Sequence, residues 1–165
     1  MKKLIAIGIT LALVLSIMAV PAMAAPQGTN NPASTNVFLF PKDTTTWEFI
    51  TDGAWAKVEY VLDGQELSGV CKGHKLTVDA TYKLISYNDP WGSDPQSVVI
   101  DSGTADKNGK LYIEFVDVDL GSAPESWAKG YKIWLVPDSA VNDDGSFNGW
   151  SGESYLYESD LIHVD

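Results

Sequence analysis

Four carboxylates in one stretch of the chain, Asp101, Glu114, Asp117 and Asp119, suggest acid–base chemistry. The spacing of Asp117 and Asp119 places both side chains on one face of a strand, and the other two lie nearby if residues 98–118 form one hairpin. Two carboxylates at a suitable separation hydrolyse glycosidic bonds. Glycosidases usually require a deep cleft, which a small sandwich seldom has. A hydrolase with paired carboxylates is therefore the third choice of function, and we expect no enzymatic activity.

A second group of oxygen-bearing residues could bind calcium. Asp144, Ser146 and Asn148 occupy positions 1, 3 and 5 of a loop with Gly149 at position 6, as in the first half of an EF-hand loop. Position 12 is Tyr155, where that loop requires a bidentate glutamate. The alternative, a solvent-exposed turn of Asn, Asp and Gly, is the favoured interpretation. Calcium is the only cofactor that the sequence suggests.

The histidines and the single cysteine do not complete a metal or nucleophile site. Cys71 and His74 have a Cys-x-x-His spacing, but zinc needs three or four ligands and His163 is the only other histidine. No Gly-x-Ser-x-Gly elbow is present. We expect Cys71 to be a buried apolar residue and His74 to cap a loop.

The chain has six tryptophans and seven tyrosines. Trp134 and Tyr82 fall in predicted strands and are expected to pack. Trp91, just after Asp89-Pro90, and Trp150, just after Gly149, fall in loop-like segments. An exposed ring can stack on a sugar or anchor a protein partner, and the alternative is that these rings close the ends of the fold. The candidate ligand-binding residues are therefore Trp91, Trp150 and Asp89.

The elements that position these residues are predicted from hydropathy of period two, which is typical of half-buried strands. Strands are expected at Ala54–Leu62, Leu76–Leu84, Val98–Thr104, Lys110–Val118, Tyr131–Val136, Ser154–Tyr157 and Leu161–Val164. Asn108-Gly109 predicts a hairpin between the third and fourth of them, and the last two are expected to pair. Residues 123–129 form a helical turn at most. Seven to nine strands with Gly, Asn and Asp turns predict an all-β, antiparallel β-sandwich.

The spacing of Leu76 and Tyr82 resembles the Leu-x-Pro-x-Thr-x-Tyr segment of fibronectin-type and other immunoglobulin-like domains. The tyrosine hydroxyl of that segment bonds back across the corner between two strands. Val78 and Ala80 replace the proline and threonine, so only the leucine and tyrosine match. An immunoglobulin-like topology is the expectation that follows from this resemblance.

Four segments taken together resemble a family of small secreted domains of methanogenic archaea and some bacteria. The segments are Gly73-His74-Lys75-Leu76, Tyr82–Trp91, Lys132–Val136 and Gly149-Trp150 followed by Tyr155-Leu156-Tyr157-Glu158. The resemblance covers residues 54–162. It departs from the family pattern at Lys75, Ser151-Gly152 and Tyr157. The resemblance implies the compartment but no activity, because none is established for that family.

Charge restricts the choice of partners. All eleven basic residues are lysines, and there is no arginine. Two of these lysines, Lys2 and Lys3, precede the expected cleavage site. The mature chain would therefore have nine lysines against 22 acidic residues, a net charge of −13. Nucleic acid and anionic lipid are excluded as main partners, since both require clusters of basic side chains. The apolar content of 45% excludes an acidic disordered chain.

The N-terminus predicts export. Lys2 and Lys3 precede an uncharged stretch from Leu4 to Val20, and Ala22-Met23-Ala24 has the small residues that signal peptidase requires. The alternative, an uncleaved anchor, does not account for that ending. We therefore expect a signal peptide at 1–24, a flexible leader at 25–36 and one β-sandwich domain at 37–165, with no membrane span after cleavage.

These observations predict a secreted, non-enzymatic interaction module of the cell surface or extracellular space. Its partner is expected to be a protein or a polysaccharide of the cell envelope. The alternative to a protein-interaction or structural module is a carbohydrate-binding module that uses exposed tryptophans. The sequence does not indicate an oligomeric state.

Overall fold

The computed structural model describes residues 36–88, 96–121 and 130–163. The described residues form nine strands and two short 3₁₀ helices and contain no α-helix. The strands are β1 (Asn36–Phe40), β2 (Trp55–Asp63), β3 (Glu66–His74), β4 (Thr81–Tyr87), β5 (Ser97–Thr104), β6 (Leu111–Asp119), β7 (Gly130–Pro137), β8 (Tyr157–Glu158) and β9 (Ile162–His163). The 3₁₀ helices are η1 (Asp138–Ala140) and η2 (Gly152–Ser154).

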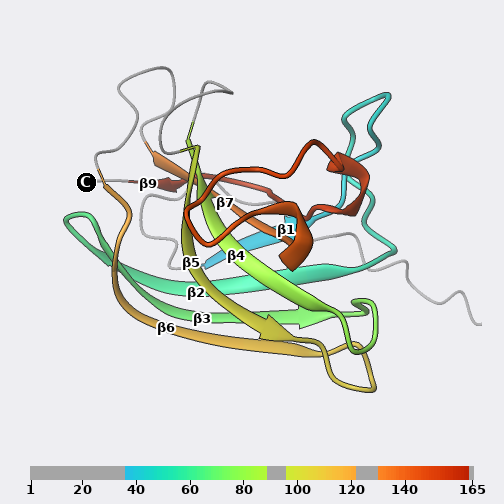
Figure 1. Cartoon of the computed structure of the whole chain (residues 1–165), viewed down its shortest axis with the longest axis horizontal. Helices are drawn as coiled ribbons and strands as arrows, with labels where there is room; N and C mark the ends of the chain where they lie inside the picture. The colour runs from blue at the N-terminus through green and yellow to red at the C-terminus, as the bar shows by residue number, and fades with distance from the viewer. Residues whose placement is uncertain (1–35, 89–95, 122–129, 164–165) are drawn as a thin grey trace, which may run out of the picture.

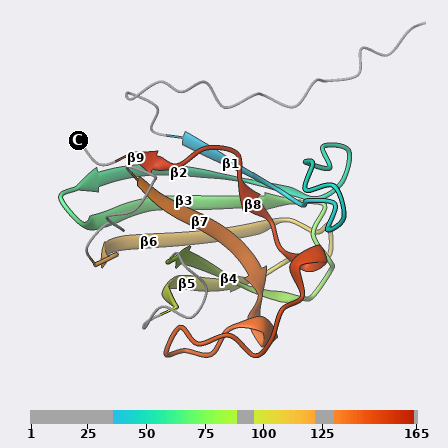
Figure 2. The same cartoon turned by 90° about the horizontal axis from the view of Figure 1, so that it is seen from above.

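The strands of the described residues pair into two antiparallel sheets with the orders β6-β3-β2-β1-β8 and β5-β4-β7-β9. The two sheets pack face to face (Figures 1 and 2), which confirms the predicted all-β sandwich. β1 begins at Asn36, one residue before the expected domain boundary. The expected signal peptide, nearly all of the leader and the stretch 123–129 lie outside the described residues. In the described ranges, no helix is long and apolar enough to cross a membrane.

Two sequence-based expectations about strand pairing are wrong. β5 and β6 belong to different sheets, so the Asn108-Gly109 turn connects the sheets rather than two strands of a hairpin. The turn forms, but Gly109 bonds to the loop before β4: its carbonyl accepts the Leu76 amide at 3.0 Å. The two C-terminal strands also separate, since β8 pairs with β1 and β9 with β7.

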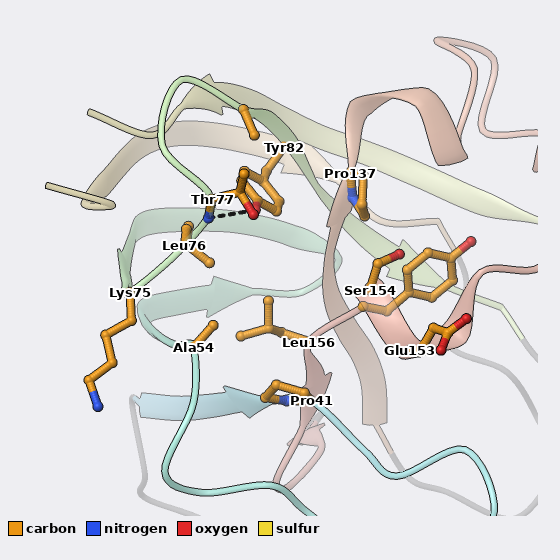
Figure 3. A pocket seen from close by; sticks show the side chains of 12 residues that line it. Pro41, Ala54, Lys75, Leu76, Thr77, Tyr82, Pro137, Glu153, Ser154 and Leu156 are labelled. Carbon is orange, nitrogen blue, oxygen red and sulfur yellow. Dashed lines mark hydrogen bonds between the residues drawn. The ribbon is translucent and has the colours of Figure 1, made fainter. Parts of the chain in front are cut away.

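The expected strand over Leu76–Leu84 is wrong in its first half. Lys75 and Asp79 have positive φ angles of 56° and 59°, so the chain turns there and β4 starts only at Thr81. The corner predicted from Tyr82 is present. The buried Tyr82 hydroxyl accepts the amide N–H of Thr77 at 3.2 Å and ties this loop to β4 (Figure 3).

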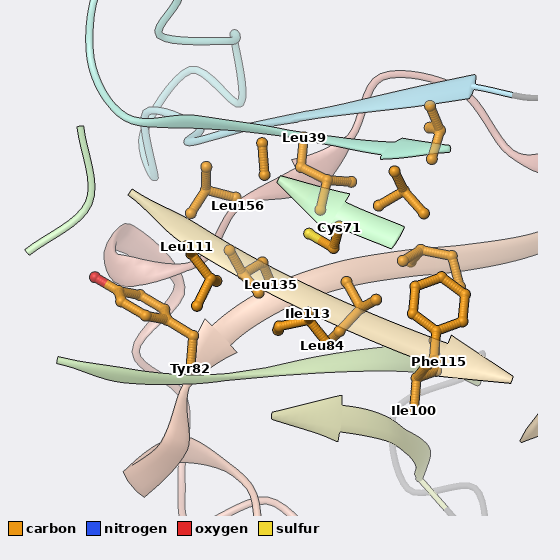
Figure 4. Packing of buried hydrophobic residues seen from close by; sticks show 14 of the residues in the cluster. Leu39, Cys71, Tyr82, Leu84, Ile100, Leu111, Ile113, Phe115, Leu135 and Leu156 are labelled. Carbon is orange, nitrogen blue, oxygen red and sulfur yellow. The ribbon is translucent and has the colours of Figure 1, made fainter. Parts of the chain in front are cut away.

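The inner core fills the space between the sheets (Figure 4). It is mainly aliphatic, because alternate residues of each strand point inward and are Val, Leu or Ile. Leu39, Leu84 and Leu135 are completely buried, and Cys71 lies among them as expected. Burial raises the pKa of the Cys71 thiol to about 12, so this cysteine is an apolar core residue rather than a nucleophile.

A second cluster covers the opposite face of β4 and β7. Its rings are Tyr87, Trp134, Tyr155 and Tyr157, with Phe147 packed against them. The side chains of β7 are therefore mostly buried on both faces. The covering segment is the chain after η1, and the loop between β1 and β2 reaches the cluster through Trp47, whose ring centroid lies 6.2 Å from that of Tyr157.

Candidate functional site

A pocket of about 340 Å³ opens where the outer aromatic cluster meets the covering loops. We call it the aromatic pocket. Tyr87, Lys132 and Trp134 reach it from β4 and β7, Tyr157 and Glu158 from β8. The other lining residues come from loops and are Lys42, Trp47 and Trp150. Rings on several sides, with a few charged groups among them, are the composition expected of a small-ligand site.

Trp47 is held at the pocket by a tight loop. The Asp43 carboxylate accepts the amides of Thr45 and Thr46 at 2.8 and 2.9 Å, and the Asp43 carbonyl accepts the Trp47 amide at 2.7 Å. Trp47 itself has φ 61°, a conformation that costs a bulky residue about 1 kcal/mol or more. The chain therefore maintains a strained backbone that presents this ring.

Trp150 is positioned by its glycine neighbours and by two tyrosines. Gly149 has φ 112°, and a Cβ on Gly152 would lie 2.6 Å from the Trp150 ring. The Tyr157 hydroxyl donates to the Gly152 carbonyl at 2.9 Å, and the Tyr155 hydroxyl donates to the Gly149 carbonyl at 3.4 Å. Only glycine allows the indole to fold back so closely over this segment.

The two loop tryptophans meet over the buried rings. Their ring centroids are 6.3 Å apart, and Trp150 also packs against Trp134 at 6.3 Å and Tyr155 at 5.4 Å. Yet Trp47 is 53% and Trp150 47% exposed. Each ring thus combines a packed side with a face open to solvent, which is the arrangement of a binding platform.

Glu158 is the acidic group of the pocket. Burial raises the pKa of its carboxyl to about 7, although its own backbone amide and the ammonium groups of Lys42 and Lys132 lower it. The nearby Trp134 indole N–H also lowers this pKa, but the two groups do not reach hydrogen-bond geometry. Trp134 Nε1 and Glu158 Oε2 are therefore buried without a hydrogen bond to any described residue. Such atoms are rare in folded proteins and mark candidate ligand contacts.

Lys42 supplies a positive charge against aromatic surface. Its Nζ lies 4.7 Å from the Phe49 ring centroid and 5.2 Å from that of Tyr157. No carboxylate of the described residues lies within 4.0 Å of this ammonium. Burial lowers the pKa of Lys42, and the charge of Lys132 lowers it further. The pocket thus has two ammonium groups and one carboxyl.

Of the candidate binding residues, Trp150 lies in this pocket, whereas Trp91 and Asp89 lie outside the described residues. Sequence reasoning assigned no binding role to Lys42, Trp47 or Glu158. For Trp47 there was a signal, a large aromatic in a loop-like segment. A single lysine and a single glutamate far apart in the chain gave none.

The proposed calcium residues form a hydrogen-bonded turn. Asp144 Oδ1 accepts the Ser146 amide and hydroxyl at 2.9 and 2.6 Å, while the Asn148 amide donates to Asn142 Oδ1 and the Ser139 carbonyl. The structure brings Asp144 and Ser146 together but directs Asn148 elsewhere. The described residues include no group of three or more His, Cys, Asp or Glu side chains that could hold a metal ion.

The other chemical candidates are also separated. Asp101 lies on β5 and Asp117 on β6, and these strands belong to different sheets. The expectation that one hairpin brings these carboxylates together is therefore wrong. Asp117 Oδ1 accepts a hydrogen bond from Ser68 at 3.0 Å. His74 stacks on Trp55 with ring centroids 4.1 Å apart, and Cys71 points to the inner core from the opposite face of β3.

A second pocket of about 340 Å³ lies at the open end of the sandwich, beside the Tyr82 corner (Figure 3). Its lining is largely apolar and includes Leu76, Pro137 and Leu156. At its rim, the Lys75 ammonium donates to the Asp52 carbonyl at 3.1 Å. None of the buried unbonded polar atoms of the described residues belongs to this lining, so the aromatic pocket is the better candidate.

Neither a protein-family model nor a curated protein matches this chain. The site must therefore be interpreted from its own geometry.

Proposed function

We propose that this protein is a non-catalytic binding module that attaches to a polysaccharide of the cell envelope through the aromatic pocket. The main observation in support is that two half-exposed tryptophans, Trp47 and Trp150, line a pocket with two buried polar groups. These are the Glu158 carboxyl and the Trp134 indole N–H, and neither Glu158 Oε2 nor Trp134 Nε1 makes a hydrogen bond with a described residue. Pyranose rings have apolar faces that stack on aromatic side chains and hydroxyls that satisfy polar atoms.

A binding role is favoured over hydrolysis by the number of acids in the pocket. Among its described lining residues, Glu158 is the only carboxylic acid. Glycosidases of the usual kind need a pair, one as acid and one as base or nucleophile. A single buried carboxyl is suited to accepting or donating hydrogen bonds to sugar hydroxyls.

Strand order supports an immunoglobulin-like topology as part of this proposal. β2, β3 and β6 correspond to strands A, B and E, and β5, β4, β7 and β9 to C′, C, F and G. Under this correspondence the Tyr82 corner lies between B and C rather than between E and F. Strand order, not the tyrosine, therefore carries the assignment, and an experimental structure in which β6 does not pair with β3 would contradict it.

Secretion is the second part of the proposal and rests on the N-terminal sequence. If Ala22-Met23-Ala24 is recognised by signal peptidase, the exported protein begins at Ala25 or close to it. Mass spectrometry of protein recovered outside the cytoplasm measures this directly. An intact Met1 retained in the membrane fraction contradicts secretion.

Electrophoresis through gels that contain soluble polysaccharides tests carbohydrate binding. At least one envelope-type polysaccharide should retard the protein, and the same polysaccharide should shield tryptophan fluorescence from acrylamide, because Trp47 and Trp150 become covered. Unchanged mobility and quenching with every polysaccharide would contradict the proposal.

A protein partner is the second candidate function. The outer face of the β6-β3-β2-β1-β8 sheet exposes Val61, Tyr112 and Val116 to 66%, 60% and 68%. Exposed apolar side chains near a sheet edge are a common feature of protein contact surfaces. Loss of binding to intact envelopes in a Val116→Lys variant, with binding to purified polysaccharide unchanged, would favour this candidate.

A further inference from the structure

The ligand class can be narrowed by the charges of the aromatic pocket, on the assumption that the proposed carbohydrate binding is correct. The chain carries an excess of eleven acidic over basic residues, yet the pocket lining holds two lysines and one acid. The charge of the pocket is thus opposite in sign to that of the protein. A neutral sugar would gain little from this reversal, whereas an anionic sugar would be attracted locally.

Lys42 is the group that distinguishes the two ligand types. Its ammonium lies over the rings of Phe49 and Tyr157 and has no carboxylate of the described residues within 4.0 Å. A half-buried ammonium group forms stronger hydrogen bonds to an anion than to a neutral acceptor. Glu158 is close enough to influence Lys42 electrostatically without forming an ion pair with it.

We propose that the aromatic pocket binds an acidic sugar of the hexuronate type, with its carboxylate at Lys42 Nζ and its ring against the exposed faces of Trp47 and Trp150. Glu158 then contacts a sugar hydroxyl rather than the carboxylate. This assignment uses each unusual feature of the pocket: the Lys42 charge and the Glu158 Oε2 atom, neither of which has a partner among the described residues, and the exposed indoles.

The charge state of Glu158 makes binding depend on pH. The groups that face it are Lys42, Lys132 and Tyr157, and the pKa of Tyr157 is raised by burial, so this phenol does not ionise near neutrality. As the pH falls through about 7, Glu158 takes up a proton and the pocket becomes more positive. A hexuronate stays ionised in this range, so its binding should tighten.

Calorimetric titration with an oligogalacturonide and a neutral galacto-oligosaccharide of equal length tests the inference. The acidic ligand should bind about tenfold or more tightly than the neutral one, as expected for one charge-assisted hydrogen bond. Lys42→Gln should abolish this preference and Lys42→Arg should retain most of it. Lys75→Gln, a lysine outside the pocket, should change neither affinity. Added salt should weaken only the acidic ligand.

Glu158→Gln provides a second, independent readout. The wild-type protein should bind the oligogalacturonide more tightly at about pH 6 than at about pH 8, and the variant should lose this dependence. Equal affinities for both ligands, without effects of salt or pH, would overturn the acidic-sugar assignment while leaving carbohydrate binding intact. If neither of these two ligands nor any other polysaccharide binds, the proposed function is overturned, and this inference with it.

Discussion

The inner core and the outer aromatic cluster are both buried, but they differ in chemistry. The inner core consists mainly of aliphatic side chains that alternate along paired strands. The outer cluster is built around Tyr and Trp rings and adjoins the strained Trp47. It contains Trp134 Nε1 and borders Glu158 Oε2, two buried atoms without a hydrogen bond to any described residue. Positive φ angles and unbonded buried atoms also occur elsewhere, for example at Lys75 and at Ser86 Oγ. The outer cluster differs because both features lie there beside half-exposed indoles, and they lower stability where the fold alone does not require them.

The largest expected effect on stability belongs to the inner core. Leu135→Ala should lower the free energy of unfolding by about 3 kcal/mol or more, because Leu135 is completely buried and leaves a cavity. Urea unfolding measures this change. Val116→Ala, on the exposed surface of β6, should remain within about 0.5 kcal/mol of the wild type. A similar loss in both variants would mean that the inner core does not dominate stability.

The next effect distinguishes the outer cluster by its dependence on pH. Glu158 has its pKa raised to about 7, so the folded protein holds this proton more tightly than the unfolded chain. The cost of ionising it grows as the pH rises from about 4.5 to about 7. Glu158→Gln should therefore stabilise the protein by about 2–3 kcal/mol at pH near 8 and have almost no effect near pH 4.

A control of opposite sign is available in Glu59. Its pKa is lowered to about 2 by the ammonium groups of Lys72 and Lys57, so it stabilises the fold above its unfolded-state pKa. Glu59→Gln should destabilise the protein near neutral pH. If Glu158→Gln gives the same sign as Glu59→Gln at pH near 8, the Glu158 carboxyl is not buried as described.

The Tyr82 corner should have a smaller effect. Tyr82→Phe removes the acceptor for the Thr77 amide from a buried site and should destabilise the protein by about 1–2 kcal/mol. Tyr112→Phe, on an exposed tyrosine, is the matched control. An unchanged midpoint of unfolding for Tyr82→Phe would show that the hydroxyl contributes nothing to the corner.

The smallest effect is expected in the turn that contains Asp144. Its carboxylate bonds only within the exposed turn, so Asp144→Ala should cost less than about 1 kcal/mol. Calcium at constant ionic strength should shift the melting temperature of neither protein. A calcium-dependent shift of the melting temperature that is lost in Asp144→Ala would show that this turn binds calcium.

The hydropathy pattern predicted the positions of most strands better than it predicted which strands pair. Alternation correctly gave the strands around Val58, Ile113 and Ile133 and the faces that they bury. It could not assign partners, because the same pattern fits either sheet. The Asn108-Gly109 turn formed as predicted, but the Gly109 carbonyl bonds to Leu76 in a distant loop, and β6 pairs with β3 in the other sheet.

The site was predictable only in part for a related reason. Trp150 was identified because aromatic residues between glycines stand out in a sequence. Lys42 and Glu158 are 116 positions apart and become neighbours only when β8 pairs with β1. The φ angle of Trp47 depends on bonds to Asp43 that propensity does not encode.

The measurement that most directly tests the central claim compares binding and stability in a variant with both Trp47 and Trp150 changed to Ala. Calorimetry with a polysaccharide that retards the wild-type protein should give a loss of about 30-fold or more, typical of aromatic hot spots. The melting temperature should fall, because each ring has a packed side, but a single cooperative transition above the assay temperature should show that the variant is folded. Trp55→Ala, which changes a tryptophan of β2 that stacks on His74 and does not line the pocket, should keep full affinity. Unchanged affinity in the double variant, or an equal loss in Trp55→Ala, would contradict the assignment of binding to the aromatic pocket.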